Sequence, residues 1–339
     1  MPSGARTSVA LRRDLRSLSQ EADTNDPNPL ILSRRRALWL AGSLGIAAAL
    51  RPLLGVAADA ISSASPTITR AIPKTGERLP VIGLGTSLVF DVGENQAGRK
   101  ALVEVIRTLV SGGGKVIDTA SSYGTAETVV GAILAETGLR PRTFIATKLE
   151  SHELADADLQ GSLKRLRTGK IDLMQLHNVS DPDQSLEPLR KWKERGLCRY
   201  VGITSTSHAD YAAVEAVLRR EKPDFLQIDY SLGDREAEKR LIPLCVGLGT
   251  AILTAVPLGH GGLFRQVRGR PLPQWAGEFD AASWAQFFLK FVLGNDAVTA
   301  AIPATNNPRR MADNLGAGRG RLPNAAQRRR MVQFIESLG

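Results

Sequence analysis

Short runs of apolar and β-branched residues recur along the chain from residue 81 onward. Between them lie longer segments, such as 102–110 and 129–134, in which apolar residues return every three or four positions, the spacing of one helix face. The runs predict eight strands, at residues 81–85, 115–119, 143–148, 171–177, 200–205, 225–230, 250–256 and 298–302. Eight strand-then-helix units are the signature of an α/β (β/α)8 TIM barrel.

Three further segments add to this barrel. Residues 72–79 place a Thr-Gly turn between two short apolar stretches, which predicts a hairpin that plugs the N-terminal end. Residues 259–280 lengthen the interval before the last strand and predict a long loop or small extra helix at one rim. Near the C-terminus, apolar residues at helical spacing predict an extra helix with the basic run 327–330 on its wet face.

The N-terminal region has a different composition. Residues 1–32 are polar and are predicted to be disordered. Residues 33–60 contain Arg34-Arg35-Arg36, an apolar stretch at 37–50 and a candidate Ala-x-Ala cleavage site. This stretch is shorter than the about 20 apolar residues that a bilayer requires. We therefore expect residues 61–339 to form one barrel domain preceded by an export signal.

Residues 33–60 resemble a twin-arginine signal, with Ala37 where a Phe is usual. The resemblance implies recognition by the twin-arginine export machinery and a periplasmic location, or a cytoplasmic one if the signal is not functional. That route carries folded cargo, which suits an enzyme that must enclose its cofactor before export.

Composition excludes several classes of function. The formal charge of +10 is spread along the chain, aromatic residues make up 5%, and the two kinds do not interleave, so nucleic-acid binding is not expected. Two cysteines, Cys198 and Cys245, cannot build a disulfide framework and are expected in the core. The four histidines lack the spacing of paired metal ligands on a helix, so no metal is predicted. We expect a monomer.

Polar residues follow most of the predicted strands. They are Thr86, Asp118, Lys148, His177, Ser205 and Gln227. In a barrel these positions share the rim on which active sites are built. The chain has no G-x-S-x-G elbow and no G-x-x-x-x-G-K loop, and Gly83-Leu84-Gly85 lacks the third glycine of a dinucleotide-binding turn. A doubly wound fold is therefore disfavoured. Taken singly, each polar residue also fits an ordinary role as a cap, a packed ring or a solvated charge.

The segment 118–124, with Glu127 and Gly131 after it, resembles the aldo/keto reductase family. The likeness continues in order through Lys148, the Leu-His-Asn at 176–178, 202–205, Gln227, the Pro-Leu-Gly at 257–259 and 302–314, and it covers about residues 72–320. It implies that Tyr123 is the general acid, and that Asp118, Lys148 and His177 complete a catalytic tetrad. A phenol donates poorly at neutral pH unless its pKa is lowered. We expect Lys148 to do this, Asp118 to hold Lys148 charged, and His177 to position the carbonyl.

The resemblance also implies a nicotinamide cofactor, because no side chain supplies a hydride. Arg310 on the helix after the eighth strand favours NADP(H), with NAD(H) possible. The implied cofactor residues are Thr86, Asn178, Ser205, Gln227, Leu258, Gly259, Arg310, Asp313 and Asn314. His260 lies in the loop expected at the pyrophosphate, whereas His152 and His208 are assigned to the surface.

The chain departs from the family's pattern at two places. Ala304 replaces a lysine that supplies a phosphate charge, and Ala255 or Val256 replaces the aromatic that stacks on the nicotinamide.

The expected activity is reduction of an aldehyde or ketone, with a small carbonyl compound as substrate. A non-catalytic cofactor-binding module and a Schiff-base lyase using Lys148 stay open as alternatives. Loops 87–96 and 259–280 are expected to shape the pocket, with Phe90, Trp275 and Phe279 as candidate walls.

Overall fold

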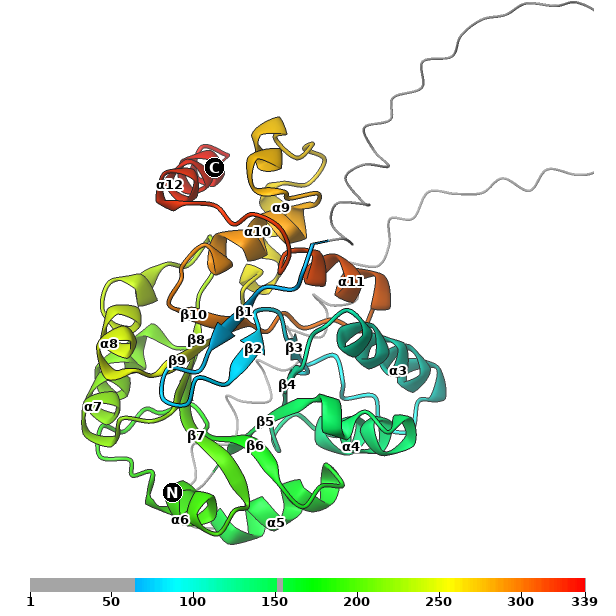
Figure 1. The fold of residues 1–339 in the computed structure, drawn as a ribbon, viewed down its shortest axis with the longest axis vertical. Helices are drawn as coiled ribbons and strands as arrows, with labels where there is room; N and C mark the ends of the chain where they lie inside the picture. Colours follow the sequence, from blue (N-terminus) through cyan, green and yellow to red (C-terminus); the bar gives the residue numbers. More distant parts are fainter. Residues whose placement is uncertain (1–64, 151–154, 339) are drawn as a thin grey trace, which may run out of the picture. The chain divides into compact units, whose positions relative to one another are not determined.

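The structure is a computed structural model that describes residues 65–150 and 155–338 (Figure 1). By its internal contacts the chain divides between Leu53 and Leu54, and every described residue belongs to the second unit. The polar region 1–32 and the signal expected at 33–60 lie outside the described residues, so both stay predictions.

Eight parallel strands form one sheet in the order β10-β9-β8-β7-β6-β5-β4-β3. They are β3 (Leu84–Gly85), β4 (Val116–Asp118), β5 (Phe144–Leu149), β6 (Ile171–Leu176), β7 (Cys198–Ser205), β8 (Phe225–Asp229), β9 (Ala251–Ala255) and β10 (Val298–Ala301). Parallel bridges from Ile82 to Ala301 and from Gly85 to Ala304 join the first strand to the last. The predicted (β/α)8 barrel is confirmed.

The helices surround these strands, as Figure 1 shows. They are α3 (Gln96–Ser111), α4 (Ala126–Thr137), α5 (Ala155–Arg165), α6 (Glu187–Glu194), α7 (Tyr211–Glu221), α8 (Leu241–Leu248), α10 (Trp284–Leu293) and α11 (Pro308–Gly316). In α3, Asn95 caps the first turn by accepting from the Gly98 N–H, and the buried residues follow the predicted helical spacing from Leu102 to Val110. That buried face packs on the barrel.

The predicted hairpin consists of β1 (Thr69–Ala71) and β2 (Arg78–Pro80), which pair antiparallel. Ile72 and Leu79 are buried in one cluster with residues at or near the N-terminal ends of the barrel strands, including Val116, Phe144 and Phe225. In Figure 1 the hairpin overlies the strands. It therefore plugs the N-terminal end and leaves the opposite rim for chemistry.

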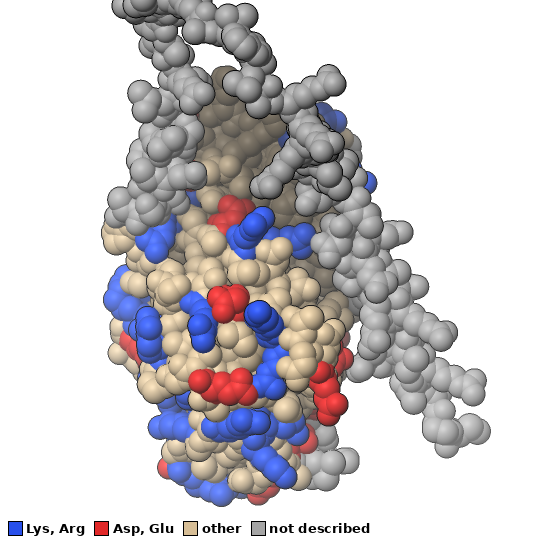
Figure 2. Space-filling view, turned by 90° about the vertical axis from the view of Figure 1, so that its right-hand side faces the viewer, with Lys and Arg blue, Asp and Glu red and all other residues tan. Residues whose placement is uncertain are grey.

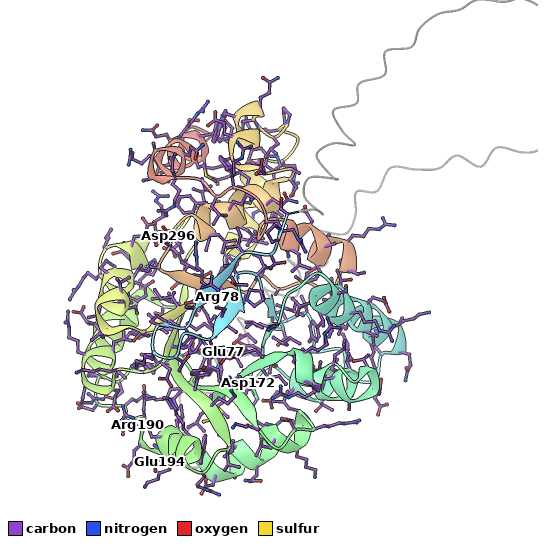
Figure 3. All side chains as sticks on the ribbon, viewed as in Figure 1. Glu77, Arg78, Asp172, Arg190, Glu194 and Asp296 are labelled. Carbon is purple, nitrogen blue, oxygen red and sulfur yellow. The ribbon has the colours of Figure 1, made fainter. Side chains whose placement is uncertain are left out.

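Ion pairs fix this plug to the barrel. Glu77, beyond the turn of the hairpin, accepts from Arg199 and, at 2.6 Å, from the Tyr200 hydroxyl. Arg199 also pairs with Asp172 of β6 at 3.0 Å. Glu77 and Asp172 are labelled in Figure 3 near the centre of the barrel. The contacts hold the turn against the starts of β6 and β7.

The segment 259–280 contains α9 (Gly262–Gln266) between two short 3₁₀ turns, η5 (Gly259–Gly261) and η6 (Gln274–Phe279). Trp275 and Phe279, which we expected to be walls of a pocket, instead pack against other aromatic side chains. Phe279 is fully buried, and the Trp275 ring lies 5.4 Å from Phe287 and 5.8 Å from Phe334, centroid to centroid. Phe90 is likewise in the core. Packing against Phe287 of α10 and against Phe334 shields the Trp275 and Phe279 rings from water.

The extra C-terminal helix is α12 (Ala325–Glu336), with Met331 and Ile335 buried as predicted. Its arginines do more than face water. The Arg328 guanidinium lies 4.5 Å from the Phe291 ring centroid, and its Nε donates to the Phe291 carbonyl at 3.1 Å. Arg330 lies 4.3 Å from the Trp275 ring centroid. These cation–π contacts help to hold α12 on the barrel.

The face drawn in Figure 2 intersperses acidic and basic side chains. Ion pairs among the described residues include Arg140 with Asp172 and Arg219 with Glu215. Within residues 65–150 and 155–338, no helix has the length and hydropathy needed to cross a bilayer. Cys198 and Cys245 are both buried and free, as expected of core residues.

Candidate active site

A buried ion pair lies at the C-terminal ends of two neighbouring strands. Asp118 ends β4, Lys148 is the next-to-last residue of β5, and their side chains are 4% and 1% exposed. Lys148 Nζ donates to Asp118 Oδ2 and to the Thr119 carbonyl, both at 2.8 Å. Removing two charges from water is costly unless they are paired and hydrogen-bonded, and here they are both.

Two glutamines complete the polar layer around this pair. Gln175 donates to Asp118 Oδ1 at 3.4 Å and to Gln227 Oε1 at 3.0 Å, and Gln227 donates to Asp118 Oδ2 at 3.3 Å. The carboxylate therefore accepts from three side chains. This network fixes Asp118 and, through it, the direction of the Lys148 ammonium.

Tyr123 is held beside the ammonium by a tight turn. Gly124 has φ +61, and a Cβ there would lie 2.4 Å from the Asp91 carboxyl group. Asp91 in turn accepts from the Thr125 N–H at 3.0 Å and from its hydroxyl at 2.9 Å. The Tyr123 ring centroid is 4.9 Å from Lys148 Nζ. Glycine is thus needed for both the backbone conformation and the close approach.

Burial and the neighbouring charges shift the pKa values of Lys148 and Tyr123 in opposite directions. Burial alone would lower the pKa of Lys148, but Asp118 and Tyr123 raise it above the usual lysine value. Burial raises the pKa of Tyr123, and the attraction of Lys148 offsets only part of the rise. This corrects our expectation of a lowered phenol pKa, because burial outweighs the ammonium. The phenol accordingly keeps its proton at neutral pH, as a proton donor must.

His177 follows β6 and lies edge-on to Tyr123, with ring centroids 5.9 Å apart. Its Nδ1 is 2.7 Å from Glu150 Oε2, and the Ser122 hydroxyl donates to Glu150 Oε1 at 2.8 Å. The structure thus brings together all four residues assigned to the tetrad.

Most of the expected nicotinamide contacts lie on the same rim. Thr86 and Ser205 are buried, Thr86 donating to the Asp118 carbonyl at 2.9 Å and Ser205 to the Ser207 carbonyl at 3.4 Å. Asn178 is exposed with φ +50, and its N–H donates to Thr204 Oγ1 at 2.9 Å. Gln227 is already engaged with Asp118 and Gln175. Its amide belongs to the ion-pair network.

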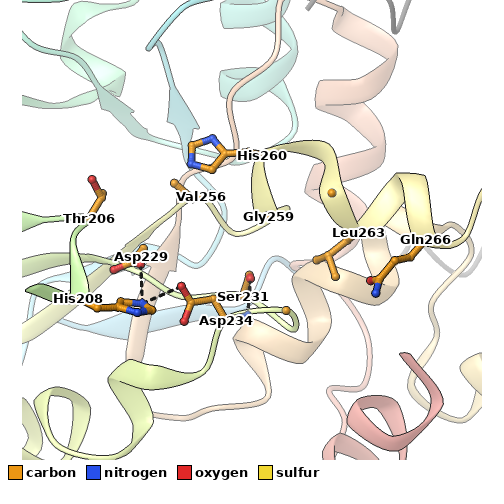
Figure 4. Close-up of a pocket in the computed structure, with 12 residues that line it drawn as sticks. Thr206, His208, Asp229, Ser231, Asp234, Val256, Gly259, His260, Leu263 and Gln266 are labelled. Atoms are coloured by element: carbon orange, nitrogen blue, oxygen red, sulfur yellow. Dashed lines mark hydrogen bonds and ion pairs between the residues drawn. The ribbon is translucent and has the colours of Figure 1, made fainter. Parts of the chain in front are cut away.

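A cavity of about 640 Å³ opens beyond β7, β8 and β9 (Figure 4). Thr206, Asp229, Ser231, Val256, Gly259, His260 and Leu263 contribute to its lining. Gly259, with φ +60, and the exposed His260, with φ +51, form one wall at the predicted pyrophosphate loop. Leu258 is half-buried beside them. A cavity of this size suits part of a dinucleotide.

His208 joins two loops across this cavity. Its Nε2 lies 2.9 Å from Asp234 Oδ2 and 3.3 Å from Asp229 Oδ2, as the dashed lines of Figure 4 show. Burial and the neighbouring Asp234 raise the pKa of Asp229, while the Tyr211 hydroxyl that donates to it acts to lower it. These three residues have the spacing of metal ligands. In the structure the imidazole itself bridges the two carboxylates.

The three residues expected at the adenosine behave differently from one another. Arg310 is exposed in the first turn of α11, where Asn307 caps the helix. Asn314 is buried on the same helix. Asp313 accepts from Ser283 at 2.7 Å and from Gln286 at 2.8 Å, so its carboxylate ties α11 to the start of α10. Of the three, Arg310 is the side chain best placed to meet a phosphate.

Sequence reasoning missed Glu150, Ser122 and Gln175. Gln175 could have been found, since it lies two positions before His177 on β6 and therefore faces the same side of the strand. The same rule finds Glu150, two positions after Lys148 at the end of β5, whereas Ser122 lies in the turn before Tyr123 and carries no such signal.

The fold and this polar cluster define a TIM-barrel oxidoreductase with its chemistry at the C-terminal rim. A sequence model of the aldo/keto reductase family matches residues 81–329, and the chain belongs to that family of NAD(P)H-dependent oxidoreductases. It is 30% identical over 195 residues to the methylglyoxal reductase YeaE of Escherichia coli, which covers 55% of this chain and 67% of that protein. It is 29% identical over 191 residues to the aldo-keto reductase YhdN of Bacillus subtilis, covering 51% and 56%.

Solved structures show the same architecture. An aldo-keto reductase from Klebsiella pneumoniae in complex with NADPH superposes with a TM-score of 0.68 at 24% identity, covering 80% of this chain and 95% of that one. A Klebsiella pneumoniae aldo/keto reductase in complex with NADP and acetate gives 0.65 at 25% identity, with 77% and 93% covered. The predicted fold, including the order of strands and helices, agrees with these structures.

Proposed function

We propose that the protein reduces an aldehyde or ketone to an alcohol with NADPH, using Tyr123 as the proton donor. The observation that carries this proposal is the position of the Lys148 ammonium, 2.8 Å from the Asp118 carboxylate and 4.9 Å from the Tyr123 ring centroid. A buried cation held beside a phenol stabilises the phenolate that forms when the proton leaves. His177 stands next to the same phenol, at the distance expected of a second group on the substrate oxygen.

Each residue then has a defined task. A nicotinamide cofactor, when bound, would provide the hydride and its electron pair for the carbonyl carbon. Tyr123 gives the hydroxyl proton to the carbonyl oxygen, which becomes the alcohol. Lys148 balances the charge left on Tyr123, and Asp118 keeps the ammonium oriented. The phenol recovers its proton from solvent to complete the cycle.

The residues that line the cavity and begin α11 fit such a cofactor. The cavity provides glycine-rich backbone at Gly259 and Gly262, which allows close approach of a diphosphate. Its two carboxylates, Asp229 and Asp234, both contact Nε2 of His208, at 3.3 and 2.9 Å. Arg310 offers a guanidinium, which pairs well with a 2′-phosphate. The NADPH and NADP complexes of the two similar Klebsiella proteins support the same choice.

The lyase alternative requires Lys148 as a neutral amine. Asp118 and Tyr123 instead raise the pKa of this lysine, which keeps it an ammonium. The direct test is aldehyde-dependent oxidation of NADPH by the purified protein. The aldehydes tested should include methylglyoxal, from which the E. coli relative takes its name. An adduct at Lys148 trapped by borohydride would establish the lyase, whereas NADPH binding with no turnover of any carbonyl would establish a binding module.

Arg310→Ala is expected to weaken NADPH binding about 10- to 150-fold, because a hydrogen bond between charged groups contributes about 1.5–3 kcal/mol. NADH lacks the 2′-phosphate, so its affinity should change by less than about twofold. Fluorescence titration with both cofactors measures the difference.

Arg309→Ala is the matched control for this variant. The two arginines are adjacent and exposed at the start of α11, so they contribute equally to the overall charge of the protein. If both variants weaken the binding of NADPH and NADH to the same extent, the effect comes from the overall charge of the protein, and Arg310 does not bind the 2′-phosphate.

A further inference from the structure

Glu150 contacts one edge of the His177 ring with both of its oxygens. Nδ1 lies 2.8 Å from Oε1 and 2.7 Å from Oε2, and Ser122 donates to Oε1 at 2.8 Å. Glu150 stands two residues after Lys148, just past the end of β5. Its side chain is 32% exposed and that of His177 is 11% exposed. The carboxylate thus belongs to the rim and is held against the imidazole.

This carboxylate is ionised at neutral pH. Burial alone would raise the pKa of Glu150, but the hydrogen bonds from His177 and Ser122, together with the nearby Lys148 ammonium, bring it below the usual value. An ionised carboxylate has no proton to give and can only accept. The hydrogen between Glu150 and His177 must therefore be on Nδ1.

We propose that Glu150 is a positioning residue that fixes this proton on Nδ1 of His177, so that the ring donates to a substrate oxygen only when Nε2 carries a second proton. The inference rests on the proposed function, in which His177 contacts the carbonyl. A neutral ring with its proton on Nδ1 presents a lone pair at Nε2, which repels a carbonyl oxygen. The doubly protonated ring presents an N–H instead, and Glu150 balances its charge, as the aspartate does for the histidine of serine hydrolases.

The charged groups around the cleft agree with this arrangement. On the β4 and β5 side, Asp118 balances Lys148. Glu150 then supplies a second negative charge next to His177 and accepts from the neutral Ser122 hydroxyl, while the neutral Tyr123 ring lies against His177. A substrate oxygen between Tyr123 and His177 would meet two donors, each with a charged partner behind it.

The Glu150→Gln variant removes the negative charge of the side chain and keeps its size. The glutamine has the same size but can donate as well as accept, so the neutral ring can place its proton on Nε2 and still bond to residue 150. We expect wild-type kcat to fall roughly tenfold as the pH rises from about 6 to about 9, because donation from Nε2 then requires a second proton on the ring. The variant should change by less than about twofold over that range.

Titration of Tyr123 does not contribute to this pH dependence of kcat, because its raised pKa keeps the phenol protonated over the whole range. Glu150→Asp restores a carboxylate and should return part of the wild-type slope. Ser122→Ala, which removes only the outer contact to Oε1, should leave the slope unchanged. Parallel pH profiles for the wild type and Glu150→Gln would overturn the proposal.

A second measurement does not depend on turnover. Nitrogen-15 spectra of the imidazoles at about pH 8, with His177 assigned by comparison with His177→Asn, report which nitrogen carries the proton. We expect Nδ1–H in the wild type and in Ser122→Ala, and mainly Nε2–H in Glu150→Leu. The same tautomer in all three would refute the role of Glu150. A protein that shows the expected tautomers but reduces no carbonyl would instead refute the proposed function.

Discussion

Tyr123→Phe should reduce carbonyl turnover about 10²- to 10⁴-fold, the range by which a positioned general acid accelerates a reaction. This loss corresponds to about 3–5 kcal/mol in the activation free energy. Phenylalanine retains the ring that packs against His177 but has no proton to donate. NADPH affinity should stay within about twofold of the wild type, because the proton is needed for chemistry and not for binding the cofactor. Stopped-flow turnover and fluorescence titration measure the two quantities.

Tyr200→Phe is the matched control. It removes a tyrosine hydroxyl at the plugged end of the barrel, where that hydroxyl bonds to Glu77 at 2.6 Å and to Thr75 at 3.0 Å. Turnover should be unaffected by this change. Equal activity of Tyr123→Phe and Tyr200→Phe would remove Tyr123 from the mechanism.

The second large effect concerns the stability of the buried ion pair. Asp118→Asn should lower the free energy of unfolding by about 3–5 kcal/mol, because it leaves the Lys148 ammonium buried without a countercharge. Lys148→Met should cost a similar amount by leaving the carboxylate unpaired. The double variant Asp118→Asn/Lys148→Met removes both charges and should be clearly more stable than the sum of the single losses predicts. Urea unfolding followed by circular dichroism gives the three values.

The pH dependence of this pair follows from the sign of its pKa shift. Lys148 has a raised pKa in the folded protein, so its contribution is complete at neutral pH and is lost only as the pH rises through that raised value, above the usual lysine range. Additive losses in the double variant would show that the two charges do not interact as the 2.8 Å contact requires.

The barrel and the clustering of Asp118, Lys148 and His177 at its rim were predictable because both depend on short-range patterns. Each strand is a run of apolar residues, and the residue at its C-terminal end must point toward the common rim. Asp118, Lys148 and His177 occupy such ends, so the topology alone brings them together. The hairpin was predictable for the same reason, since its turn residues and flanking apolar positions are contiguous in the sequence.

Contacts between side chains on different loops could not be predicted in this way. His208 was assigned to the surface, and it is half exposed, but it bridges Asp229 at the end of β8 and Asp234 in the loop that follows. The Tyr123 pKa depends on a balance between burial and a neighbouring charge, and the sequence contains no measure of either. The aromatic Trp275 lies on a rim loop by sequence, yet it packs against α12, more than 50 positions later.

The hairpin plug has a consequence for the order in which the molecule can assemble. Arg70 of β1 donates to the carbonyl of Asn295, 225 positions further along the chain, and to that of Val298 in the last strand. Ile72 and Leu79 likewise need strands spread over the whole barrel to cover them. During synthesis the first part of the domain to emerge must therefore wait, apolar and uncovered, until nearly the last part is made. Chains halted before β10 would expose this hairpin, and we expect them to be recognised by chaperones or proteases through it.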